Sequence, residues 1–130
     1  MAIESGVIPQ PTRTELNILN ILWNKGRCTV REVHEALNQV EPSGYTTALK
    51  MLQVMHQKGQ VLRDDSERAH VYYAAVSKDQ TQNLFLADLA DRLFDGSTSR
   101  LVMQALGSSP KADSAEVERI RELLSNLNED

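Results

Sequence analysis

The feature that most constrains the fold is a change in the period of the apolar residues at Gly59. Across residues 43–58 apolar side chains recur at steps of three and four, which predicts an amphipathic helix ending at Gly59. Residues 60–63 and 68–74 instead alternate with a period of two on either side of a polar turn, which predicts a β-hairpin. The fold must therefore join a helix directly to a hairpin.

Two further helices precede this boundary, and each begins with a capping box. Thr12 is followed three positions later by Glu15, and Thr29 by Glu32, so each hydroxyl can accept an amide hydrogen while the carboxylate reaches back. Three short helices followed by a hairpin are the layout of a winged helix-turn-helix domain, whose third helix is the reading element. The predicted fold is mainly α with a small β-hairpin wing, followed by further helices.

The predicted third helix has an outer face suited to a polyanion. No Asp or Glu occurs between Glu41 and Asp64, a run of 22 residues, so nothing there repels phosphate. Ser43 is the expected N-cap. Hydroxyl, amide and lysine side chains can reach base edges or phosphates from this helix, and cations of the wing can reach the DNA backbone. The predicted DNA-binding residues are Ser43, Tyr45, Thr46, Thr47, Lys50, Arg68 and His70. An ordinary solvated face remains the alternative, and a place in the core is an equal alternative for Tyr45.

Charge divides the chain into two parts. Residues 1–78 contain nine Lys or Arg and eight Asp or Glu, for a net charge of +1, whereas residues 79–130 contain five and ten, for −5. A near-neutral N-terminal part and an acidic C-terminal part suggest two separate functions. With one cysteine, no basic apolar leader and no long apolar run, the expected location is the cytoplasm.

The C-terminal part has more apolar residues than one packing face needs. A capping box at Ser77 opens the first of three predicted helices, and the last of them has apolar residues spaced 3, 4, 3, as in a short coiled-coil seam. Pairing with a second copy would bury this surface; packing back on the winged helix is the alternative. The predicted domains are a flexible arm (1–10), a winged helix (11–77) and a helical dimerisation domain (78–130). The predicted dimerisation residues are Leu86, Leu89, Leu93, Leu101, Val102, Val117, Ile120, Leu124 and Leu127.

Other chemistry is sparse. Cys28 precedes the Thr29 cap between two arginines, an environment that lowers a thiol pKa, so a redox sensor is conceivable beside the simpler role of a small apolar residue in a turn. The three histidines lack ligand spacing, which predicts no metal site. Neither a catalytic triad nor a glycine-rich phosphate loop occurs, and we expect no cofactor and no enzymatic activity.

The order of these motifs resembles the penicillinase-repressor family of bacterial regulators. The resemblance rests on the two capping boxes, on Leu22-Trp23, on Tyr45-Thr46-Thr47, on Lys58-Gly59 and on residues 91–97 (Asp-Arg-Leu-Phe-Asp-Gly-Ser). It implies a homodimeric repressor whose winged helices bind a palindromic operator and whose C-terminal helices dimerise. In many members it also implies release through cleavage by a partner, a membrane metalloprotease, near the junction of the last two helices. The chain itself is not expected to insert into a membrane.

Several residues depart from the family pattern. Gln104 and Ala105, the possible cleavage region, stand where cleaved members often have Asn-Phe, and the C-terminal cysteine cluster of the copper-responsive branch does not occur. Glu67 precedes Arg68 where the wing often reads Gly-Arg. The function inferred is a dimeric operator-binding repressor released by weakening of the dimer. A winged-helix adaptor that docks a protein instead of DNA is the alternative.

Overall fold

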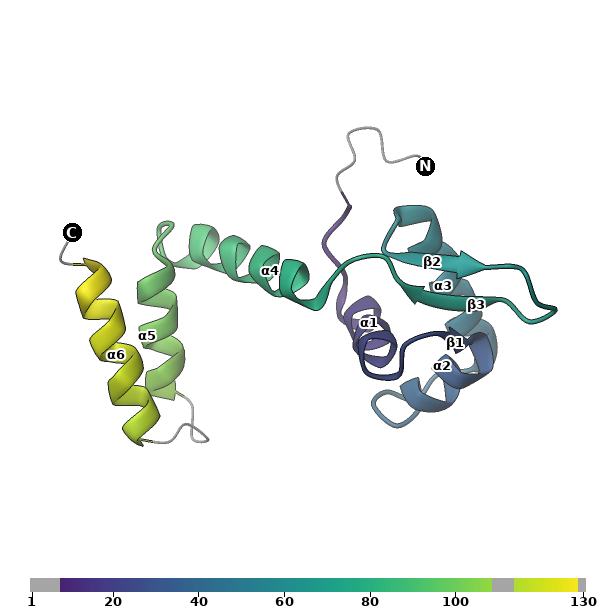
Figure 1. Ribbon diagram of the computed structural model, residues 1–130, viewed down its shortest axis with the longest axis horizontal. Helices are drawn as coiled ribbons and strands as arrows, with labels where there is room; N and C mark the ends of the chain where they lie inside the picture. Colours follow the sequence, from purple (N-terminus) through teal and green to yellow (C-terminus); the bar gives the residue numbers. More distant parts are fainter. Residues whose placement is uncertain (1–7, 109–113, 129–130) are drawn as a thin grey trace. The chain divides into compact units, whose positions relative to one another are not determined.

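The computed structural model describes residues 8–108 and 114–128, which fall into two compact units, Met1–Thr81 and Gln82–Asp130. The elements are α1 (Arg13–Lys25), β1 (Cys28–Thr29), α2 (Val30–Leu37), α3 (Tyr45–Lys58), β2 (Val61–Asp64), β3 (Val71–Ala74), α4 (Lys78–Leu93), α5 (Thr98–Ser108) and α6 (Ser114–Asn128) (Figure 1). The mainly helical fold with a small hairpin is the one predicted.

The capping boxes form as the sequence indicates. The amide of Glu15 donates to the hydroxyl of Thr12 at 3.3 Å, and the amide of Thr12 donates to the Glu15 carboxylate at 3.0 Å. Thr29 and Glu32 make the same reciprocal pair at the start of α2. Each pair satisfies two amides that the first helical turn leaves without partners.

The start of α3 differs from the prediction. Gly44, not Ser43, is the N-cap, and no side chain caps this helix. Ser43 is held one position earlier in the turn, where its amide donates to the side-chain oxygen of Asn38 at 2.9 Å and its carbonyl oxygen lies 2.9 Å from Nε2 of His34. The end of α3 is as expected, with Gly59 in the left-handed region at φ 84°, a conformation that glycine adopts without steric cost.

The hairpin belongs to a three-stranded antiparallel sheet in the order β1-β3-β2. The two-residue β1 was not predicted; it pairs Cys28 with Tyr72. The return strand begins at Val71 rather than at residue 68, because Val71 already faces Asp64 across the register and residues 65–70 form the connection.

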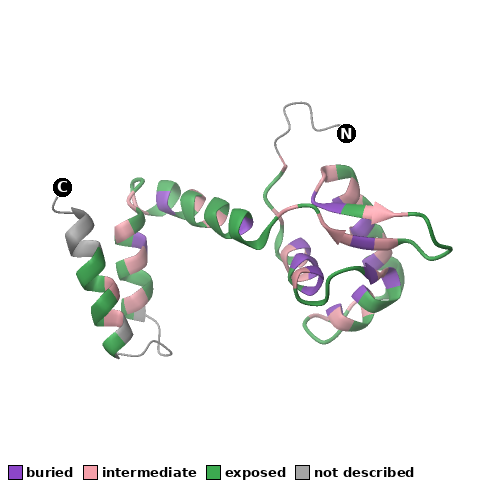
Figure 2. Cartoon of the chain, viewed as in Figure 1, coloured by how far each residue is buried: buried purple, intermediate pink, exposed green. Residues whose placement is uncertain are grey.

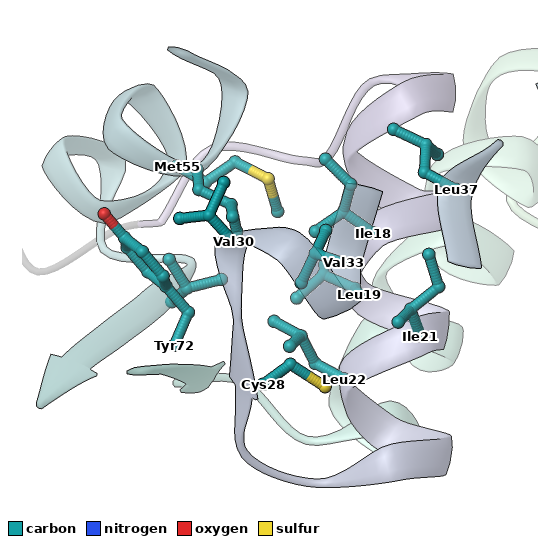
Figure 3. Close-up of a cluster of buried hydrophobic side chains, with 12 residues drawn as sticks. Ile18, Leu19, Ile21, Leu22, Cys28, Val30, Val33, Leu37, Met55 and Tyr72 are labelled. Carbon is teal, nitrogen blue, oxygen red and sulfur yellow. The ribbon is translucent and has the colours of Figure 1, made fainter. Parts of the chain in front are cut away.

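The core of the first unit lies among α1, α2, α3 and the sheet. Figure 3 shows side chains from these elements converging on one cluster. Its fully buried members include Ile18, Leu19, Val33, Leu37, Leu52, Met55, Val61 and Tyr72. The indole nitrogen of Trp23 donates to the carbonyl of Val76 at 3.0 Å, which fixes the chain leaving β3 against the end of α1.

Among the residues of the second unit whose burial the structure describes, few side chains are buried. Ala90 and Leu101 are buried, whereas large apolar residues are exposed along α4, whose ribbon is mostly coloured as exposed in Figure 2. The exposed leucines of α4 are Leu84, Leu86, Leu89 and Leu93. This unit therefore presents apolar surface that its own described residues do not cover.

Candidate nucleic-acid interface

The outer face of α3 is exposed and free of carboxylates. Thr46, Thr47 and Lys50 are exposed, while Ala48 and Leu52 on the opposite face are buried in the core. Lys50 makes no ion pair within the part of the chain that the structure describes. The hydroxyls and the ammonium group can thus reach a ligand without first breaking an ion pair.

Tyr45 lies at the first position of α3 and is 48% exposed, so it is not a core residue. Its ring packs edge-on against His34 with 5.9 Å between centroids and an interplanar angle of 82°. Because His34 also contacts the Ser43 carbonyl, one histidine of α2 supports both the turn and the aromatic ring. The ring of Tyr45 is thus held in place while its hydroxyl can face a ligand.

Carboxylates engage most of the cations near the wing. Arg27 pairs with Asp64 at 2.7 Å, and Asp65 lies 2.8 Å from Arg63 and 3.6 Å from His70. Hydrogen bonds from Ser66, followed by that from Arg27, hold the pKa of Asp64 below its usual range, so Asp64 stays charged. The guanidinium carbon of Arg27 also lies 4.2 Å from the centre of the Tyr73 ring, so a second contact holds this side chain.

A groove of about 440 Å³ opens between the start of α2, α3 and the β2–β3 connection. Its lining residues are Thr29, Val30, Arg31, Tyr45, Leu49, Arg68, Ala69 and His70. The groove brings together three residues predicted separately to contact DNA: Tyr45, Arg68 and His70. It adds Arg31, which sequence reasoning missed because its only local signal, a position in a capped first turn, is common to many solvated residues. Ser43, Thr46, Thr47 and Lys50 do not line it.

A buried polar cluster links the first turn of α1 to the end of α3 and to the chain before α1. The Glu15 side chain is only 3% exposed and accepts a hydrogen bond from Nζ of Lys58 at 2.7 Å. Gln60, also buried, donates from its amide to Glu15 and to the Pro9 carbonyl, each at 3.2 Å. Burial opposes ionisation of Glu15, but the hydrogen bonds from Lys58, Thr12 and Gln60 outweigh it and hold its pKa below the usual value.

Cys28 does not have the environment expected of a reactive thiol. The side chain is 1% exposed. Burial, with a smaller contribution from the Glu32 carboxylate, raises the pKa of the thiol despite the nearby Lys25. The expected lowering of its pKa is wrong, because the first turn of α2 is already capped by a carboxylate and the thiol points into the core.

The predicted dimerisation residues are distributed unevenly over the second unit. Leu86, Leu89 and Leu93 are exposed, and Val102, Val117 and Ile120 are half-buried. Leu101 is buried within its own unit, and the side chains of Leu124 and Leu127 lie outside the described residues. Gln104 and Ala105, of the possible cleavage region, are exposed on α5.

Neither a metal cluster nor a membrane span occurs in the part of the chain that the structure describes. Among residues 8–108 and 114–128, no group of three His, Cys, Asp or Glu side chains is placed to hold a metal ion. Over the same residues, no helix has the length and apolar character needed to cross a membrane.

The three-helix unit, its wing and the exposed face of α3 define a winged helix-turn-helix protein. The chain belongs to the penicillinase repressor family, whose model matches residues 11–126. This membership confirms that the chain is a transcription regulator and not an enzyme.

Related proteins agree with this assignment. Two Mycobacterium tuberculosis strains, CDC 1551 / Oshkosh and ATCC 25618 / H37Rv, each have a transcriptional regulator BlaI that is 28% identical over 106 residues, covering 81% of this chain and 77% of the relative. The solution structure of the Bacillus licheniformis BlaI monomeric form in complex with the blaP half-operator superposes with a TM-score of 0.50 at 23% identity, over 56% of this chain and 89% of that one. That likeness confirms the fold.

Proposed function

We propose that the protein is a transcriptional repressor that binds operator DNA through the outer face of α3. The observation that carries this proposal is the exposed, carboxylate-free surface of Thr46, Thr47 and Lys50, set directly over a buried apolar face. The family membership and the half-operator bound by the related Bacillus protein support it. A rigid helix with such a face can lie in a major groove without repelling phosphate.

The proposed DNA-binding residues fall into two groups, those that can contact bases and those that can contact the sugar-phosphate backbone. A threonine methyl can contact a thymine methyl and its hydroxyl can hydrogen-bond a base, while Lys50 can reach O6 and N7 of guanine. Tyr45, Arg68, His70 and the turn around Ser43 would contact the sugar-phosphate backbone, which fixes the position of the protein without reading sequence.

We also propose that two copies bind a palindromic operator together. The exposed Leu86, Leu89 and Leu93 on α4 support pairing through the second unit. Weakening of this dimer would release the DNA, in the cytoplasm where such a regulator acts. Proteolysis by a membrane metalloprotease is the route that the family resemblance implies, and the exposed Gln104–Ala105 region of α5 is its candidate site.

The test is an operator titration at fixed salt, with a palindromic duplex selected by the wild-type protein from a random-sequence library. Thr47→Ala and Lys50→Ala should each lower operator affinity by about 1–3 kcal/mol if the side chain contacts a base, without lowering thermal stability. Arg13→Ala, which removes one positive charge from an exposed position at the start of α1, outside the second unit, is the control and should bind normally. A wild-type protein that selects no duplex and shows no salt-dependent binding would favour the protein-docking adaptor.

A further inference from the structure

We propose that the groove between α2, α3 and the wing holds one sugar-phosphate unit of the operator backbone, with Arg31 as a contact on the α2 wall. The inference rests on the proposed function and deepens it, because it assigns a backbone contact to a residue that lies outside the reading helix. Arg31 and Arg68 line the groove from two different elements, Arg31 from α2 and Arg68 from the β2–β3 connection.

The chemistry of the lining fits this ligand. A DNA backbone alternates an anionic phosphate with an apolar deoxyribose. For the phosphate, the groove provides the cationic side chains of Arg31 and Arg68 and the Tyr45 hydroxyl. For the deoxyribose, it provides the apolar side chains of Val30 and Leu49. None of the described residues that line it carries a carboxylate, although the chain has more acidic than basic residues. Since α3 forms one wall, DNA read by the outer face of α3 would pass beside the groove.

The two arginines are available for such a contact. Arg31 lies 3.4 Å from Glu35, but both side chains are mostly exposed, 83% for Arg31, and a pair of this kind is held weakly. Arg68 makes no ion pair with any residue that the structure describes. His70 is less available than the two arginines, because Asp65 lies 3.6 Å from its ring. Arg31 and Arg68 are therefore the residues to test.

The experiment measures affinity of the full-length protein for its selected duplex and for a random duplex at several salt concentrations. Each phosphate contact contributes about 0.9 to the slope of log affinity against log salt concentration. Arg31→Ala should reduce the magnitude of that slope by about 0.9 per bound subunit. It should also lower the affinity for both duplexes to the same extent, roughly tenfold per subunit at 0.1 M salt. Arg31→Lys, which keeps the charge, should restore most of the slope.

Two further variants distinguish a contact in the groove from an effect of net charge or of folding. Arg13→Ala removes the same charge from an exposed position at the start of α1, outside both the groove and the second unit, and its slope should equal that of wild type. Arg68→Ala tests the contribution of the β2–β3 connection, and it replaces Arg31→Ala as the test if Arg31→Ala lowers the thermal midpoint.

The possible results are distinct. Slopes unchanged in Arg31→Ala and Arg68→Ala, with salt-dependent binding by wild type, would overturn the groove and leave the proposed function intact. An equal loss of slope in Arg13→Ala would also overturn it, because the effect would then follow net charge. A loss confined to the selected duplex would make Arg31 a base contact and refute the backbone assignment. A wild-type protein that binds neither duplex would refute the proposed function itself.

Discussion

Replacing Glu15 with Gln should destabilise the first unit because it removes the charge that Lys58 faces in a nearly dry site. The carboxylate is 3% exposed and lies 2.7 Å from the ammonium nitrogen. Deleting one partner of a buried ion pair costs about 3–5 kcal/mol. The Lys58 side chain is 33% exposed, so its ammonium can turn to water, and we expect a loss of about 2–3 kcal/mol. That loss corresponds to a fall in the thermal midpoint of about 10–20 °C.

Urea unfolding followed by tryptophan fluorescence is the assay, since Trp23 is the only tryptophan and lies in the first unit. Lys58→Met is the matched variant: it keeps the aliphatic stem but leaves the Glu15 carboxylate buried without its cation, so it should cost at least as much as Glu15→Gln. The double variant should cost clearly less than the sum of the two single losses. If the loss in the double variant equals the sum of the two single losses within about 0.5 kcal/mol, the two side chains do not interact, because losses at independent sites add to that accuracy. That result would refute the proposed ion pair.

The same cluster predicts a dependence on pH. Folding lowers the pKa of Glu15 below the ordinary value of 4.5. Well above pH 4.5 the carboxylate is therefore charged in both the folded and the unfolded chain, and it contributes its full stabilisation to the folded state. As pH falls below 4.5 and through the lower folded-state pKa, this contribution is lost. The wild-type free energy of unfolding should therefore fall more steeply than that of Glu15→Gln as the pH is lowered below 4.5. Parallel curves would show that Glu15 does not carry the effect.

The remaining predictions concern the wing and the second unit. Asp65→Asn should raise affinity for any duplex several-fold, because it releases Arg63 and His70 and removes a negative charge beside the phosphates; unchanged affinity in a salt titration would place the wing away from DNA. Leu93→Asp should shift the protein to monomer in sedimentation while circular dichroism stays helical, because Leu93 is 69% exposed in the chain and would be buried in a dimer. A dimer of undiminished strength would exclude Leu93 from the interface.

The features that the sequence predicted well are local ones. Capping boxes join residues three positions apart, so Thr12 with Glu15 and Thr29 with Glu32 are visible in any short window and form as expected. The change of period at Gly59 is equally local. The winged helix follows from these signals because only a few arrangements join three short helices to a hairpin.

The features that escaped prediction depend on residues outside such a window. The two-residue β1 has no period of its own and exists because Cys28 meets Tyr72 on β3. The Glu15–Lys58 pair spans 43 positions. Ser43 looks like a cap from its neighbours, yet the Asn38 side chain, five positions earlier, takes its amide. The binding role of each site residue stays a prediction, whereas exposure and position are now known.

The distribution of charge suggests why a second copy would matter to this protein. Residues 1–78 have a net charge of only +1, and two cations in or beside the wing, Arg63 and Arg27, are paired to Asp65 and Asp64. A single reading unit therefore has little electrostatic attraction for DNA beyond α3 and the groove. Joining two units would raise the effective concentration of the second at its half-site without adding any contact. With half-sites about 34–36 Å apart, one helical turn of DNA, each copy could place its α3 in successive major grooves. Weak individual binding would then make occupancy depend steeply on pairing, so a signal that acts only on the acidic second unit could release the operator without touching the reading surface.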